Sequence, residues 1–95
     1  MKFFTINNDP TRIYFQNIER RPLREEFNKV KEELAKCGCA IGPKKEVCTA
    51  DIYECNFSNG EKFDLIFDET DDGTCLYLKS SQSIEQVKQI FEYQR

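Results

Sequence analysis

An amphipathic helix in the first half of the chain most constrains the fold. Over residues 22–37, apolar side chains recur at spacings of four, three, four and three, at Leu23, Phe27, Val30, Leu34 and Cys37. This spacing places them along one face of an α-helix. Pro22 is typical of a first helical position, and Gly38 is typical of the left-handed residue that follows a helix. A helix with one apolar face must pack on another element, so we expect the rest of the chain to form a sheet.

Two short segments before the helix predict an opening β-hairpin. Residues 3–6 and 12–18 are rich in aromatic and β-branched side chains. Between them lies the turn-forming sequence Asn7-Asn8-Asp9-Pro10.

Residues 47–57 and 62–68 predict a second hairpin around Ser58-Asn59-Gly60. A two-residue Asn-Gly turn would mix apolar and polar side chains on each face. A three-residue loop with a left-handed Gly60 instead sets Cys55 opposite Phe63 and Tyr53 opposite Leu65. We prefer this register because it gathers the apolar side chains on one face, namely Phe57, Cys55, Tyr53, Phe63, Leu65 and Phe67. The other face then carries Glu54, Asn56, Lys62, Asp64 and Asp68, with Ile52 and Ile66.

The remaining segments complete a single domain over residues 1–95. Gly42-Pro43-Lys44-Lys45 is interpreted as a solvated turn, residues 69–73 as a second turn and residues 74–79 as a strand. Ser83 and Gln86 have the spacing of a capping box for a last helix that presents Ile84, Val87, Ile90 and Phe91 on one face. The order ββαβββα predicts an α+β fold, a mainly antiparallel sheet covered by two helices.

Three apolar residues of the later strands fall outside the phenylalanine-rich face in this scheme. We expect Ile66, Leu76 and Leu78 on the opposite face of the sheet. There they would form either a second buried layer or a protein interface.

The chain lacks the residues of the common catalytic constellations. It contains no His and no Trp, so neither a Ser-His-Asp triad nor a Cys-His pair can be built from it. Gly42-Pro43-Lys44-Lys45 also lacks the spaced glycines and the Ser or Thr of a phosphate-binding loop. We therefore expect a binding protein that is not an enzyme and needs no cofactor.

The five cysteines raise the question of a metal site. Cys37, Cys39 and Cys48 are the sharpest zinc candidates, but their spacing is not that of familiar zinc sites. Cys37, Cys55 and Cys75 fall in phase with predicted apolar faces, so we expect reduced thiols that pack as small hydrophobes. Zinc binding and a redox role remain open alternatives.

The acidic turn resembles part of a calcium loop. Asp68, Thr70 and Asp72 alternate, but the twelfth position of the loop is Lys79, where an EF-hand needs a carboxylate. We expect a hairpin turn and no metal.

The N-terminus lacks the apolar region and cleavage site of a signal peptide, and no apolar run approaches the ~20 residues of a membrane helix. The sequence thus predicts a cytoplasmic protein without a membrane partner.

The charge is distributed unevenly along the chain. Residues 1–45 carry ten basic and six acidic side chains, whereas residues 46–95 carry four and eleven. The bland interpretation is a solvated surface. The functional interpretation is an acidic partner-binding surface for a basic protein such as a nuclease, made of Glu54, Asp64, Asp68, Glu69, Asp71 and Asp72.

A rival interpretation is a nucleic-acid-binding regulator. It would use the cations Arg20, Arg21, Arg24, Lys44 and Lys45. With a pI of about 5.0, the chain gives this partner little support.

The segment FDLIFDETDDGTCLYLKSSQSIEQVKQIFE combines a strand, an acidic turn, a strand and a capped helix. In style, residues 46–95 resemble small immunity proteins of bacterial toxin systems, including contact-dependent growth inhibition. The resemblance carries no diagnostic motif and assigns no residue a role. It implies a cytoplasmic protein that binds one cognate toxin and covers its active site or docking surface. A phage-encoded inhibitor of a host protein would have the same acidic character.

Overall fold

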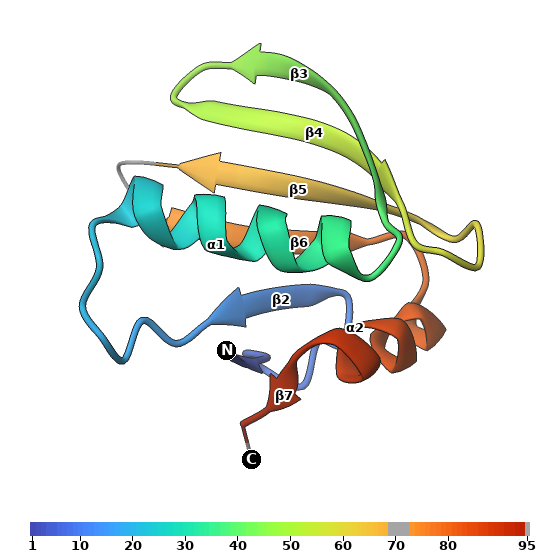
Figure 1. Cartoon of the computed structure of the whole chain (residues 1–95). Helices are drawn as coiled ribbons and strands as arrows, with labels where there is room; N and C mark the ends of the chain where they lie inside the picture. The colour runs from blue at the N-terminus through green and yellow to red at the C-terminus, as the bar shows by residue number, and fades with distance from the viewer. Residues whose placement is uncertain (69–72, 95) are drawn as a thin grey trace.

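The computed structural model describes residues 1–68 and 73–94. Within these ranges the chain forms a seven-stranded, mostly antiparallel sheet and two helices (Figure 1). The helices are α1 (Leu23–Lys36) and α2 (Ile84–Ile90), the second preceded by a 3₁₀ turn at Ser81–Ser83. The strands are β1 (Lys2–Phe4), β2 (Arg12–Phe15), β3 (Ala40–Val47), β4 (Ala50–Asn56), β5 (Lys62–Asp68), β6 (Gly73–Leu78) and β7 (Glu92–Tyr93). The predicted α+β class is confirmed.

The strand order is β3-β4-β5-β6-β2-β1-β7. Neighbouring strands pair antiparallel except β1 and β7, which run parallel. The connection from β2 to β3 crosses the sheet through α1, so this helix lies in front of the central strands (Figure 1). The first hairpin is thereby brought against β6, far away in sequence.

One core lies between the sheet and the helices. Phe27, Val30 and Leu34 of α1 are fully buried there, together with Phe63 and Leu65 of β5. The ring centroids of Phe27 and Phe67 are 5.2 Å apart, in an edge-to-face geometry that favours aromatic contact. Val87 of α2 joins the same core cluster. Both helices therefore cover the same face of the sheet.

The predicted register of the central hairpin is confirmed. Cys55 pairs with Phe63 and Tyr53 pairs with Leu65. Gly60 has a φ of +90° and closes the three-residue loop. The apolar face of the hairpin thus packs under α1, as the alternation of its side chains predicts.

Three local predictions are wrong. Gly42-Pro43-Lys44-Lys45 lies inside the edge strand β3, and Val47 ends that strand, because a tight turn at Cys48 and Thr49 separates β3 from β4. Ser80, rather than Ser83, accepts a hydrogen bond from the backbone of Gln82 at the start of the 3₁₀ turn. The Ser83 hydroxyl instead donates to Glu61.

Two further corrections concern side-chain direction. Leu76 and Leu78 face the core, because they pair with Leu65 and Phe63. Cys37 is exposed, because α1 ends at Lys36 and the left-handed Gly38 (φ +86°) turns the chain so that Cys39 is buried instead.

One acidic side chain is buried against expectation. Glu26, in the first turn of α1, is 2% exposed, and its Oε2 atom has no hydrogen-bond partner among the described residues. Desolvation raises the pKa of this carboxyl, an effect that nearby Arg21 partly offsets.

We predict that Glu26→Gln stabilises the protein at neutral pH. Because the folded-state pKa is raised, the wild type is relatively more stable below the unfolded pKa and loses that advantage as pH rises through the folded pKa. The uncharged amide should raise the free energy of unfolding at pH 7 by about 1–2 kcal/mol and flatten its pH dependence. Urea denaturation between pH 4 and pH 8 measures both effects. The exposed Glu25→Gln serves as control, and a Glu26→Gln profile parallel to the wild type would contradict the argument.

Candidate functional site

No helix or loop of the described residues covers the face of the sheet opposite the helices. Alternation along the strands sends a second set of side chains to this open face, and the core cluster contains none of them. Strand pairing places the following residues on it: Phe4, Arg12, Tyr14, Lys45, Val47, Ala50, Ile52, Glu54, Asn56, Lys62, Asp64, Ile66, Asp68, Cys75 and Tyr77.

An apolar row crosses the open face from strand to strand. Ile52 pairs with Ile66, Ile66 with Cys75, Cys75 with Tyr14, and Tyr14 with Phe4. Lys45 pairs with Ile52 and closes the row at the β3 edge. Side chains opposite each other on neighbouring strands are close enough to touch. The apolar row, defined as Ile52, Ile66, Cys75, Tyr14 and Phe4, is therefore a continuous stripe.

A polar row runs beside it. Glu54 pairs with Asp64, Asp64 with Tyr77, and Tyr77 with Arg12. The guanidinium of Arg12 lies 4.9 Å from the centre of the Tyr77 ring, a cation–π contact that fixes both side chains. The polar row, defined as Glu54, Asp64, Tyr77 and Arg12, is acidic at one end and basic at the other.

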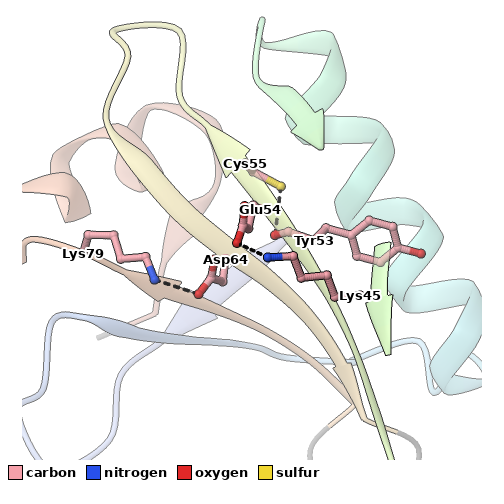
Figure 2. A network of polar contacts seen from close by, with 6 residues as sticks. All are labelled: Lys45, Tyr53, Glu54, Cys55, Asp64 and Lys79. Atoms are coloured by element: carbon pink, nitrogen blue, oxygen red, sulfur yellow. Dashed lines mark hydrogen bonds and ion pairs between the residues drawn. The ribbon is translucent and has the colours of Figure 1, made fainter. Parts of the chain in front are cut away.

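The two acids of the polar row are each paired with a lysine. Lys45 Nζ lies 2.6 Å from Oε1 of Glu54, and Lys79 Nζ lies 2.8 Å from Oδ2 of Asp64 (Figure 2). The hydrogen bond from Lys45 lowers the pKa of Glu54 and raises that of Lys45. These contacts hold two adjacent carboxylates in place while partly neutralising them.

The open face is hollowed near the β3 edge. A groove of about 510 Å³ is bounded by residues that include Pro43, Lys45, Ile52 and Lys79. The register of β3 shifts between Ile41 and Lys44, which bends this strand. At Gly42 a Cβ atom would lie 2.1 Å from the Glu54 carbonyl oxygen. Only glycine permits this close approach of β3 to β4.

The structure assembles part of the predicted acidic surface. Glu54 and Asp64 lie side by side, and Asp68 lies on the same face beyond Ile66. Glu69, Asp71 and Asp72 lie outside the described residues, as does most of the turn considered for calcium. Tyr14, Tyr77 and Arg12 were missed as site residues. The alternation of residues 12–15 predicts that Arg12 and Tyr14 point to the same face. Only the pairing of β2 with β6 shows that this face is the one that carries Asp64.

Four of the five cations of the nucleic-acid interpretation are engaged within the protein. Arg21 pairs with Glu19, Lys44 with Glu46, and Lys45 with Glu54. Arg24 pairs with Asp51, and its guanidinium lies 4.0 Å from the centre of the Phe67 ring. Arg20 is exposed. The arginines lie at the start of α1, away from the open face, so the structure does not gather the five into one patch with Lys45.

The cysteines do not form a metal centre in the described part of the chain. No three His, Cys, Asp or Glu side chains of residues 1–68 and 73–94 come together in a way that could hold a metal ion. Cys37 and Cys48 are exposed, whereas Cys39, Cys55 and Cys75 are buried. Burial is the main cause that raises the pKa of Cys39 to about 11, and it also raises the pKa of Cys55.

Comparisons with known proteins add no relative. Scans against protein-family models, curated proteins and solved structures each find no match to this chain. Neither of the two described helices has the length and apolar content needed to cross a bilayer.

We predict that two thiols react readily in the native protein and five in denaturant. Cys37 and Cys48 should be modified by a chromogenic disulfide reagent within minutes at pH 8. The other three should react only as the protein opens. The Cys37→Ser/Cys48→Ser variant is the matched control and should show almost no fast phase. Rapid modification of more than two thiols in the folded wild type would contradict the assigned burial.

We also predict that Gly42→Ala deforms the groove. The new methyl group must displace the β4 backbone, which should lower the free energy of unfolding by about 1–3 kcal/mol. Denaturant unfolding measures the loss, and NMR shifts of Glu54 and Lys45 report the groove. Gly60→Ala is the comparison, since a Cβ there meets nothing within 4 Å and only the left-handed backbone is strained. Unchanged Glu54 and Lys45 signals in Gly42→Ala would contradict this account.

Proposed function

We propose that this chain is an immunity-type inhibitor that binds and neutralises a cognate bacterial toxin. The observation that carries the proposal is the composition of the open face, where an apolar row lies between the polar row and Asp68. An apolar centre with a charged surround is the usual composition of a protein-binding surface. We further propose that the inhibitor acts in the cytoplasm by binding, without a cofactor or a reaction of its own.

Acidic side chains would give the inhibitor its selectivity for a basic partner. Glu54, Asp64 and Asp68 lie on one face, and Glu69, Asp71 and Asp72 follow them in the sequence. In a toxin that cleaves nucleic acid, the substrate cleft is positive because it binds phosphates. Carboxylates presented to that cleft would take the place of the nucleic-acid backbone, and their field would steer the two proteins together.

The lysine partners of Glu54 and Asp64 refine this proposal. Lys45 and Lys79 reduce the net charge at the centre of the open face, so long-range attraction would come mainly from the acids that follow β5 in the sequence, Glu69, Asp71 and Asp72. Glu54 and Asp64 would act at short range, since each carboxylate can accept more than one hydrogen bond.

The first experiment is capture of partners from the native host with the tagged protein, followed by mass spectrometry. A toxin bound at one-to-one stoichiometry, whose activity falls on addition of this chain, would support the proposal. If no toxin is recovered and the neighbouring genes are unrelated to toxins, the proposal loses its basis.

We predict that Asp68→Lys, Asp71→Lys and Asp72→Lys together slow association with the captured toxin. The rate constant should fall by about tenfold or more at low ionic strength and by less at high salt, because screening weakens steering. Surface plasmon resonance measures the change. The control triple variant Glu32→Lys, Glu33→Lys and Glu85→Lys makes the same charge change on the helices. Equal slowing by both triple variants would point to net charge and against the acidic surface.

A further inference from the structure

The polar row and the apolar row of the open face are each self-complementary, and we propose that this face pairs with the open face of a second copy of this chain to form a two-fold dimer. Two sheets commonly pack face to face with their strands roughly aligned and about 10 Å apart. A two-fold axis parallel to the strands, between β5 and β6, sets β5 against β6 of the other copy. The same operation sets β4 against β2, and β3 against β1.

Under this symmetry the polar row of one copy runs antiparallel to that of the other, so its first residue faces the last residue of the other copy and its second faces the third. The order Glu54, Asp64, Tyr77, Arg12 places Glu54 against Arg12 of the other copy and Asp64 against its Tyr77. A carboxylate then faces a guanidinium, and a second carboxylate faces a phenolic hydroxyl that can donate to it. Each contact occurs twice in the dimer because the interface is isologous.

The intrachain ion pairs leave room for these contacts. Lys45 binds Oε1 of Glu54 and Lys79 binds Oδ2 of Asp64, so the other oxygen of each carboxylate can face the second copy. Arg12 Nε lies 3.9 Å from Oδ2 of Asp9, and the other guanidinium nitrogens can face the second copy. The same guanidinium is held over the Tyr77 ring, which reduces the side-chain entropy lost on association.

The two apolar rows also face each other in opposite order. Ile66 lies against Cys75 of the other copy, and Ile52 lies against Tyr14. At the ends, Lys45 meets the ring of Phe4, a pairing of cation and aromatic ring. Thus no charge of either row is set against a like charge. Beyond the polar row the same operation sets Lys62 near Lys79 of the other copy, and the ion pair of Lys79 with Asp64 reduces that repulsion.

The expected dimer is weak. The six strands of the open face from β3 to β1 span about 24 Å at the usual strand spacing. With the two rows about 7 Å apart along the strands, the buried area falls below the about 800 Å² per partner of a stable interface. Association should therefore be sought from about 10 µM to about 1 mM.

Sedimentation equilibrium of the purified chain tests the dimer without any other protein. The weight-average mass should rise from 11.2 kDa towards twice that value as concentration increases. Arg12→Glu and Glu54→Arg should each weaken association by at least about tenfold, because each variant sets like charges together at two places.

Mixing the two variants is the decisive experiment. In an equimolar mixture, Glu at position 12 of one variant faces Arg at position 54 of the other, and the natural Glu54 and Arg12 face each other at the second place. Association should thus return to near the wild-type level. Tyr77→Phe should weaken it by removing the hydroxyl opposite Asp64. Lys36→Glu, on the helix side of the molecule, should have no effect.

Three results would overturn the dimer. A wild type that stays monomeric up to 1 mM excludes it. A dimer unaffected by Arg12→Glu and Glu54→Arg must use another surface. If the equimolar mixture does not associate more strongly than each variant alone, and circular dichroism shows both variants folded, Arg12 and Glu54 do not pair across the interface.

The dimer would also regulate toxin binding, an extension that rests on the proposed function. The toxin and the second copy would compete for Glu54 and Asp64, so dimerisation should lower the apparent affinity for toxin at high inhibitor concentration. The sedimentation test does not involve the toxin, so failure of the dimer and failure of the inhibitor function can be distinguished.

Discussion

The packing of α1 on the phenylalanine-rich face of the central hairpin determines the rest of this structure. Phe27 contacts Phe67 and Tyr53, with ring centroids 5.2 and 5.6 Å away. Because α1 joins β2 to the edge strand β3, this contact also fixes the path of the chain across the sheet. Both helices lie on one face, and the opposite face is left open (Figure 1).

The open face owes its chemistry to the strand order. The first hairpin brings Arg12 and Tyr14 beside β6, next to residues more than sixty positions away in sequence. Acidic side chains of β4 and β5 and a basic side chain of β2 then share the polar row. This arrangement differs from a uniformly acidic patch, because Lys45 and Lys79 already pair with Glu54 and Asp64 (Figure 2).

A mixed face of this kind reconciles two proposed roles. Acids at the end of β5 would attract a basic toxin over long distances, while the two rows would provide short-range contacts. The same alternation of charge along the polar row makes the face complementary to itself. Self-association would further bury the apolar row, in which Phe4, Tyr14, Ile52 and Ile66 are half-buried in the monomer and Cys75 is already buried.

The sequence by itself determined the local elements. The apolar period of residues 23–36 predicts α1, and alternation around Gly60 predicts the register of β4 and β5, since both signals lie within a few residues. The edge strand β3 was predicted as a turn because of Gly42 and Pro43. These residues usually mark turns, but here a bulge accommodates them within the strand. The sequence also identified Glu54 and Asp64 as facing one way. Only the tertiary structure placed Tyr77 and Arg12 beside them, because periodicity tells which side chains share a face and leaves open which strands become neighbours.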